Sequence, residues 1–424
     1  KGLGELQTYW LQIQGDGTHS TLSEGPENSS SHYLNDDAVQ DTEDFFDSYK
    51  RASLIKWHSE TLGMFLRKTI AWRELNSHLK DVKKADPAEL DTLEREAVLG
   101  HATPSHCIDF PVIEGTVDAN HVVLDDEVAR QLNMYVREVA SCYRAHPFHN
   151  FEHASHVLMS VTKLLSHMTH TEVSLDDPLT QFTLVLTALV HDIDHPGVSN
   201  QQLQTEGSSL ASMYKTSFAE RNSLDIAWKL LMRDSFKDLR RTIYTTKEEF
   251  DRFKQLLIHA LLVTDIVDRD LQTARKKRWG TLFGTGSEDD SSTSSSLASM
   301  SHQDLSNHQK TAVLEHIIQV SDVAHTMQHW NVYRRWNSCF FKETHDAYNQ
   351  GRSTQNPADN WYTGEIAFFD FYIIPLAHRL NQCPAFGASG KELLRYALNN
   401  RAEWLQKGKE VVRQLKRSEE SPRR

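Results

Sequence analysis

Apolar residues recur at spacings of three and four along most of the chain. The stretch LIKWHSETLGMFLRKTIAW, residues 54–72, follows this pattern, and similar stretches continue almost to the C-terminus. Such spacing places apolar side chains on one face of an α-helix, and no convincing run alternates with the period of two that marks a β-strand. We therefore expect an all-α protein whose antiparallel helices pack as a compact multi-helix bundle.

Two stretches interrupt the helical pattern. Residues 15–44 are rich in Ser, Gly, Asp, Glu and Asn and contain few apolar residues, which predicts a flexible linker. Residues 284–303 are rich in Ser and predict a mobile loop between helices. We expect one folded domain over residues 45–415, followed by a charged, disordered tail over 416–424.

Bulk composition excludes several classes of function. The formal net charge is −12 and basic residues form no long block, which argues against nucleic acid or an anionic membrane surface as the main partner. The four cysteines lie far apart without a CxxC pair, as expected for reduced thiols in a cytoplasmic protein. The longest apolar run, residues 182–190, is too short to span a bilayer, so we expect no membrane segment in this chain.

Histidines and aspartates occupy positions where the helical period calls for core residues. They lie in three segments, FHNFEHASHV, LVHDIDHPGVSN and IIQVSDVAHTMQHW, and the five that matter are His149, His153, His191, Asp192 and Asp322. Burying unpaired ionisable groups costs several kcal/mol, so this set requires partners. A pair of divalent metal ions would supply them.

The spacing of these residues suits a metal site. His149 and His153 are four apart and would share one face of a helix, one turn from each other. Pro196 and Gly197 should end the helix that carries His191 and Asp192, which places the site at that helix's C-terminal end. Two histidines with two aspartates suit zinc and related metals, while carboxylates with water suit magnesium or manganese. An aspartate can bridge two such ions, whose shared water becomes a nucleophile for phosphate esters.

The same segments, together with IAFFDFYIIPLA at residues 366–377, resemble the catalytic domain of class I cyclic nucleotide phosphodiesterases. The patterns HNxxH and HDxDHPGxxN occur in this order, and the resemblance runs from about Trp57 to Trp404. It implies the HD-type phosphodiesterase fold with a binuclear metal site in its interior. It also implies hydrolysis of 3′,5′-cyclic nucleotides (cGMP, cAMP or both) to 5′-nucleoside monophosphates by a metal-bridging hydroxide.

Roles follow from the resemblance position by position. His149 matches the proton donor to the 3′ oxygen, and Asp192 matches the bridge to a second ion, usually Mg²⁺ or otherwise Mn²⁺. The ligands of the tightly bound ion, usually Zn²⁺, would be His153, His191, Asp192 and Asp322. The residues that would orient ligands and metal-bound waters are His195, Glu220, Thr264 and Asp265.

The base pocket departs from the family pattern. Phe368 matches a residue that stacks on the purine, but Glu365 stands where the family has a glutamine. An ionised glutamate only accepts hydrogen bonds, which leans towards guanine with its N1–H and amino donors; burial that protonates Glu365 would cancel this preference. The other pocket positions, for which plain core packing is the competing explanation, are Tyr333, Trp336, Asn337, Val323 and His325. After Glu220, Arg221, Asn222 and Ser223 replace the run Asn-His-His of many animal members, which suggests a protist or algal type.

The first eleven residues, KGLGELQTYWL, resemble the final strand of class III nucleotide cyclase domains. This likeness predicts that residues 1–14 are the remnant of an upstream cyclase in a longer parent protein. The parent could carry a membrane anchor, with this domain on the cytosolic side.

Two alternative functions stay open. Another HD-type phosphohydrolase would use the same ligand spacing and would release inorganic phosphate. A non-catalytic regulatory module would bind cyclic nucleotide without turnover, although such modules usually lose a ligand or the donor histidine. The sequence also leaves the oligomeric state open, including a homodimer.

Overall fold

The protein is built of helices. A computed structural model describes residues 36–77, 84–104, 107–113, 117–168, 171–267, 269–284 and 300–420, and these contain no β-strand. The expectation of an all-α fold is confirmed. The elements in chain order are α2 (Asp36–Ser77), α3 (Pro87–Glu96), α4 (Asp126–Ser141), α5 (Phe151–Ser166), α6 (Pro178–Val190), α7 (Asn200–Thr205), α8 (Ser209–Met213), α9 (Phe218–Leu231), η1 (Asp234–Phe236), α10 (Lys237–Ile243), α11 (Lys247–Leu262), α12 (Arg269–Phe283), α14 (His302–Asp322), η2 (Ala324–Met327), α15 (Trp330–Asn349), α16 (Pro357–Phe368), η3 (Phe369–Ile373), α17 (Ile374–Gln382), η4 (Pro384–Phe386) and α18 (Gly387–Glu420).

The chain divides into two units, residues 1–58 and 59–424. The first unit is described only from residue 36, so the predicted cyclase remnant lies outside the described residues. The second unit contains every residue of the candidate functional site. No described helix is both long enough and apolar enough to cross a membrane.

Three helices extend into ranges that were predicted to be non-helical. Helix α2 begins at Asp36, inside the range predicted as linker. Helix α14 begins at His302, inside the predicted loop 284–303, because the Ser301 side chain caps it by accepting from the Asp304 backbone N–H. Helix α18 runs to Glu420, past the predicted domain end at 415, and pairs such as Lys407–Glu403 and Arg413–Glu410 support it along its surface.

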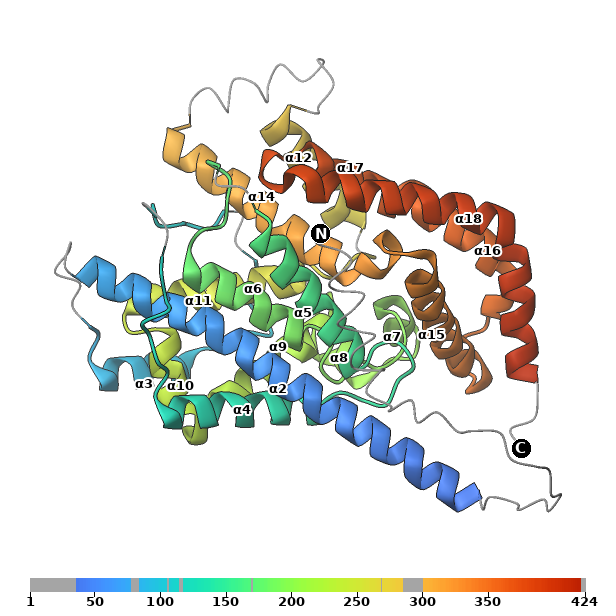
Figure 1. The fold of residues 1–424 in the computed structure, drawn as a ribbon, viewed down its shortest axis with the longest axis horizontal. Coiled ribbons are helices and arrows are strands. Elements are labelled where there is room, and N and C mark those ends of the chain that lie inside the picture. Colours follow the sequence, from blue (N-terminus) through green and yellow to red (C-terminus); the bar gives the residue numbers. More distant parts are fainter. Residues whose placement is uncertain are drawn as a thin grey trace, which may run out of the picture. The chain divides into compact units, whose positions relative to one another are not determined.

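Helix α6 is the centre of the core. Its sequence PLTQFTLVLTALV is buried at almost every position, as expected for a helix covered on all sides. Pro178 opens it, and the Asp177 side chain caps it by accepting from the Thr180 backbone N–H. Helices α5, α11 and α14 pack against α6 (Figure 1). This packing brings the start of α5 and the ends of α6 and α14 to one place.

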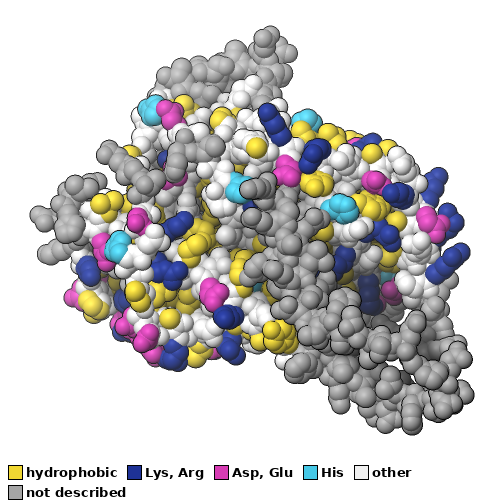
Figure 2. All heavy atoms as spheres, in the orientation of Figure 1, with side chains coloured by type: hydrophobic (Ala, Val, Ile, Leu, Met, Phe, Trp, Pro, Cys, Tyr) yellow, Lys and Arg dark blue, Asp and Glu magenta, His cyan; other side chains and the backbone are white. Residues whose placement is uncertain are grey.

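Helices α15 to α18 form a second group of packed helices. Helix α18 contacts α15, α16 and α17, and its fully buried Trp404 meets the ring of Tyr333 with centroids 5.9 Å apart. Between α16 and α17 the backbone makes a π-helical turn, η3. On the face seen in Figure 2, basic and acidic side chains are interspersed over the described surface, in keeping with the absence of a basic block in the sequence.

Candidate functional site

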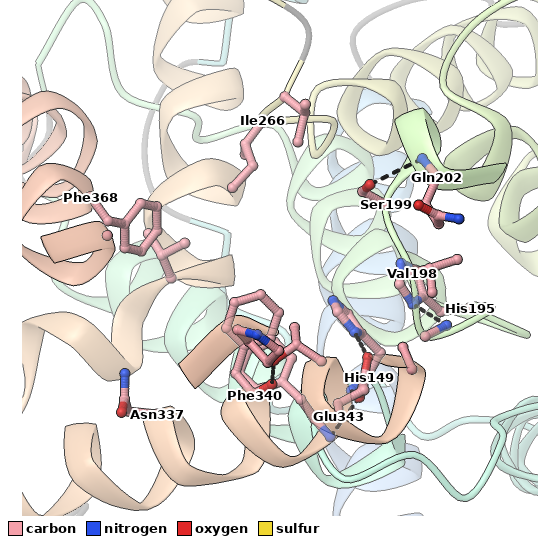
Figure 3. Close-up of a pocket in the computed structure, with 18 of the residues that line it drawn as sticks. His149, His195, Val198, Ser199, Gln202, Ile266, Asn337, Phe340, Glu343 and Phe368 are labelled. Atoms are coloured by element: carbon pink, nitrogen blue, oxygen red, sulfur yellow. Dashed lines mark hydrogen bonds and ion pairs between the residues drawn. The ribbon is translucent and has the colours of Figure 1, made fainter. Parts of the chain in front are cut away.

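A cavity of about 670 Å³ lies between the two groups of helices. Residues from α9, the turn after α6, the end of α14, α15 and α16 line it. One end carries His149, His195 and Asp192, and the other carries Glu365 and Phe368. Figure 3 shows Phe368 and Asn337 on the side opposite His149, His195 and Glu343. The cavity therefore offers an ionisable end and an aromatic end to a single ligand.

Two imidazoles and two carboxylates converge behind the ionisable end. His153 Nε2 lies 3.1 Å from Asp322 Oδ1, and His191 Nε2 lies 3.1 Å from Asp192 Oδ2 and 3.4 Å from Asp322 Oδ1. His153 Nε2 is 3.7 Å from Asp192 Oδ2. The ligand atoms of His153, His191 and Asp192 all lie within 4.8 Å of one another. The structure thus brings the four predicted ligands to one point, from α5, from the turn directly after α6 and from the end of α14.

The chemistry of this cluster fits a cation. His191 Nδ1 lies 3.1 Å from the Ala188 carbonyl and donates there, so its Nε2 faces the two carboxylates. Burial disfavours the charged imidazole, but Asp192 and Asp322 raise the pKa of His191 well above its ordinary value. Burial opposes ionisation of Asp192 and Asp322, yet the neighbouring imidazoles hold the pKa of both carboxyls well below the usual range. A divalent ion that displaced the imidazole protons would be held by two imidazole nitrogens and two ionised carboxylates, a set that suits it.

The prediction that His149 shares a helix with His153 is wrong. Helix α5 begins at Phe151, and His149 lies two residues before it in an irregular turn. Asn150 ends the helix on that side because its side chain accepts from the His153 backbone N–H at 3.0 Å. The Asn150 amide also donates to the carbonyls of His146 and Pro147, which fixes the turn. His149 is therefore held by tertiary contacts instead of by helical register.

The proton-donor candidate His149 has a carboxylate partner that the sequence analysis missed. Glu343 on α15 accepts from the backbone N–H groups of Phe148 and His149 at 2.8 and 2.9 Å and pairs with His149 Nδ1. Burial disfavours the charged imidazole, but Glu343, with Asp192 and Asp322, raises the pKa of His149 above its ordinary value. The pair holds His149 as a protonated group facing the cavity.

His195 lies against the other face of His149. The two rings stack with centroids 3.7 Å apart and planes 27° from parallel. Burial, reinforced by the neighbouring His149 charge, lowers the pKa of His195 to about 3. A neutral ring thus packs on a charged one and fixes its plane.

Glu220 and Asp265 lie together across the cavity. The Asn200 amide donates to Glu220 Oε2 at 2.9 Å and to Asp265 Oδ2 at 3.2 Å, and Ser217 Oγ donates to Asp265 Oδ2 at 2.8 Å. Burial, and then the Asp265 charge, raise the pKa of Glu220 to about 8. Asn200 was not among the predicted site residues, although it ends the HDxDHPGxxN motif. Thr264 lines the cavity while its hydroxyl donates to the Leu261 carbonyl of its own helix end.

The turn that follows α6 ends the helix earlier than predicted. The helix stops at Val190, before Pro196 and Gly197, and Asp194 adopts a left-handed φ of 59°. A non-glycine residue there carries a strain of about 1–2 kcal/mol. Arg144 Nε and Asn222 Nδ2 hold the Asp194 carboxylate at 2.6 and 3.1 Å. Ser223 Oγ donates to the Ile193 carbonyl at 2.8 Å. Two residues that depart from the animal pattern therefore fix the turn carrying Asp192.

Replacing Asn222 with alanine should weaken divalent metal binding by about tenfold, the lower end of the range for groups that orient ligands through hydrogen bonds. The reason is that the Asp194 turn, and with it Asp192, loses one of its two side-chain anchors. The measurement is a metal titration of the metal-free protein, with Asn399→Ala on the exposed face of α18 as the matched control. Equal metal affinity in both variants would rule out this positioning role.

At the aromatic end, the structure supports all but one of the predicted pocket residues as cavity lining. Val323, His325, Tyr333, Asn337, Glu365 and Phe368 line the cavity. Trp336 does not. Its ring is buried behind the wall, 5.7 Å from Phe148 and 5.6 Å from His153 between centroids. Core packing, the competing explanation, therefore holds for Trp336, because its ring faces α5, the helix that carries His153.

Comparisons with known proteins agree with this geometry. Residues 148–387 match the family described as 3′5′-cyclic nucleotide phosphodiesterase, and this range is more than half of the chain. The chain is 28% identical over 218 residues to a probable 3′,5′-cyclic-AMP phosphodiesterase, pde-4, of Caenorhabditis elegans, which covers 49% of the chain and 29% of that protein. It is 25% identical over 206 residues to the cGMP-specific 3′,5′-cGMP phosphodiesterase 3 of Dictyostelium discoideum, covering 48% of the chain and 39% of that protein. The chain thus spans less than two fifths of either relative.

The fold also resembles a solved structure. The phosphodiesterase domain of the Salpingoeca rosetta rhodopsin phosphodiesterase superimposes with a TM-score of 0.55 at 22% identity, covering 68% of this chain and 83% of that one. At this identity the likeness concerns the fold alone. It agrees with the helical architecture described above.

Proposed function

Because the chain belongs to the 3′5′-cyclic nucleotide phosphodiesterase family, we propose that it hydrolyses 3′,5′-cyclic nucleotides to 5′-nucleoside monophosphates. The observation that carries this proposal is the pairing of His149 with Glu343 at the same cavity end as the histidine–aspartate cluster. A proton donor and a cation site at one end suit a phosphodiester, and an aromatic end with one buried carboxyl suits a purine.

The cluster supports the binding of a divalent ion by His153, His191, Asp192 and Asp322, for which we propose Zn²⁺. We propose that Asp192 is shared with a second ion, Mg²⁺ or Mn²⁺, on the side of Glu220 and Asp265. Bound ions would neutralise the phosphate charge and make a bridging water acidic enough to attack phosphorus near neutral pH.

The protein's own residues handle the leaving group. As water oxygen bonds to phosphorus and the bond from phosphorus to the 3′ oxygen breaks, His149 gives its proton to that oxygen. Glu343 favours the charged imidazole beforehand and accepts from its Nδ1–H, which leaves Nε2–H to donate. The stacked ring of His195 restricts rotation of His149, so the proton is delivered in one direction.

Phe368 and Glu365 would bind the base. Phe368 lines the cavity, and the ring of Tyr372 lies parallel to it, with planes 8° apart and centroids 5.5 Å apart. An ionised Glu365 accepts from guanine N1–H and its amino group, so we propose a preference for cGMP over cAMP when this carboxyl is ionised.

The proposal is tested by incubating the protein with cAMP and with cGMP in the presence of Zn²⁺ and Mg²⁺ and separating the products. We expect 5′-AMP and 5′-GMP as the only nucleotide products. Release of inorganic phosphate from nucleotides would instead identify another HD-type phosphohydrolase. Tight binding of cyclic nucleotide without any turnover would identify a non-catalytic regulatory module.

We also propose that the domain acts in the cytoplasm as part of a longer protein with a nucleotide cyclase before Lys1. The support is the likeness of KGLGELQTYWL to the end of such domains. Isolation of the full-length protein and assay of cyclase activity would test it.

A further inference from the structure

Glu365 is a buried carboxyl at the aromatic end of the cavity. Its side chain lies on α16, and the residue is only 9% exposed although it lines the cavity. Phe368 follows one turn later on the same helix and lines the same end. A flat apolar ring beside a single buried hydrogen-bonding group favours a heteroaromatic ring as ligand, with the carboxyl reading its edge.

The neighbours of Glu365 donate hydrogen bonds to its carboxyl group. Tyr333 Oη donates to Glu365 Oε2 at 2.5 Å. The Asn337 side chain also hydrogen-bonds to Glu365, and its orientation is set because Trp361 Nε1–H donates to Asn337 Oδ1 at 3.2 Å. The Asn337 amide N–H therefore points at Glu365, and both neighbours act as donors. Neither neighbour can accept from residue 365, so a hydrogen bond that this residue donates is available to a ligand in the cavity that it lines.

This arrangement distinguishes glutamate from glutamine at position 365. A glutamine would turn its carbonyl oxygen to Tyr333 and Asn337 and present its NH₂ group, a permanent donor, to the ligand. A glutamate presents a second carboxyl oxygen, which accepts when ionised and donates when protonated. We propose that Glu365 selects the purine by its protonation state, so that the ionised form takes guanine through N1–H and the protonated form takes adenine through N1. This inference rests on the proposed cyclic nucleotide hydrolysis.

The pKa of the Glu365 carboxyl lies close to neutral pH, where enzyme activity can be measured. Burial raises the pKa of Glu365 to about 7, against the hydrogen bonds from Tyr333 and Asn337, which lower it. Tyr333 on α15 is the titratable group that contacts it, and burial keeps the pKa of Tyr333 well above its ordinary value. Burial and the two hydrogen bonds are the causes of the Glu365 shift, and no charged group is among them. Charged groups on the elements packed against α16 include these ion pairs: Asp370 with Arg401, Lys407 with Glu403, Arg335 with Glu152, Glu343 with His149 and Lys342 with Asp346.

The test measures kcat/KM for cGMP and for cAMP at several values from about pH 6 to about pH 8.5 and takes the ratio of the two. The ratio cancels every step that both substrates share, including metal binding and proton donation by His149. In the wild-type protein we expect kcat/KM for cGMP divided by kcat/KM for cAMP to rise by about tenfold from the lowest to the highest pH. One hydrogen bond gained or opposed in a desolvated site has an effect of this size.

Two variants sharpen the test. Glu365→Gln should give a ratio that does not change with pH and equals the wild-type ratio at low pH, because its outward group always donates. Tyr333→Phe should move the midpoint to higher pH, because it removes a hydrogen bond that lowers the pKa of Glu365. A pH-independent wild-type ratio, a falling ratio, or a slope that persists in Glu365→Gln would overturn the proposal.

Failure of the proposed function is recognised separately. If the wild type turns over neither substrate, the same pH series is run as calorimetric binding of 5′-GMP and 5′-AMP, since neither purine ring titrates in this range. The ratio of their affinities should rise with pH in the wild type and stay constant in Glu365→Gln. A constant wild-type ratio in this measurement would refute the role of Glu365 without any reference to catalysis.

Discussion

Replacing Asp322 with alanine is expected to remove tightly bound metal and to lower kcat/KM by at least a factor on the order of 10³. The Asp322 Oδ1 atom lies 3.1 Å from His153 Nε2 and 3.4 Å from His191 Nε2, so one oxygen joins the two imidazoles. Without it, the cluster keeps two buried rings and one carboxylate, which supply neither the charge nor the donor number of a tight divalent site.

The measurement is metal content by elemental analysis after dialysis, together with turnover at saturating metal. Asp126→Ala, an exposed aspartate in the first turn of α4, is the matched control and should keep both metal and activity. Circular dichroism of both variants checks that the helices persist. An Asp322→Ala protein that retained its metal would contradict the ligand assignment, whatever its activity.

The fold class and the ligand cluster could be predicted because both depend on simple periodicities. In a pattern with the helical period of 3.6, an ionisable residue at an otherwise apolar position is easy to recognise. His153, His191 and Asp322 each occupy such a position. Their convergence follows from α5, α6 and α14 packing side by side. The cluster could be predicted because buried polar groups within helices are rare unless they are paired; the role of these residues as metal ligands stays a prediction.

The environment of His149 could not be predicted in the same way. Sequence spacing suggested a shared helix, but the Asn150 cap starts α5 later and leaves His149 in a turn. Its partner Glu343 comes from a helix far along the chain, so no local pattern joins the two. A signal existed, because Tyr333, Asn337, Phe340 and Glu343 follow one another at intervals of four, three and three residues on the cavity face of α15. Trp336 was wrongly predicted to line the pocket. It precedes the lining residue Asn337 on α15, but its ring faces the core.

The positions that depart from the family pattern divide into two groups. Asn222 and Ser223, which replace other residues of the animal pattern, hydrogen-bond to the turn at Asp194 and Ile193. They therefore affect how the turn that carries Asp192 is supported. Glu365, which stands where the family has a glutamine, lines the cavity and accepts from Tyr333. It therefore affects the hydrogen bonds offered to the ligand. The same kind of sequence difference thus has different consequences, which only the contacts distinguish.

Replacing His149 with alanine is expected to leave metal content unchanged and to lower kcat by about 10²–10⁴-fold, the usual contribution of a positioned general acid. The imidazole lies outside the ligand cluster and is held by Glu343 and by stacking on His195, so its loss removes the proton without removing a metal ligand. His378→Ala, an exposed histidine on α17, is the matched control. Glu343→Gln should lower kcat less, and the double variant should be no slower than His149→Ala, because the two residues act as one unit.

A second substrate separates proton donation from a general loss of structure. A phosphodiester with an acidic leaving group, such as a p-nitrophenyl ester, departs without needing a proton. The deficit of His149→Ala should therefore shrink strongly for that ester and remain for the cyclic nucleotide, whose 3′ alkoxide leaves poorly. An equal deficit for both substrates would place His149 in binding or folding instead, and wild-type turnover of the cyclic nucleotide would remove it from the mechanism.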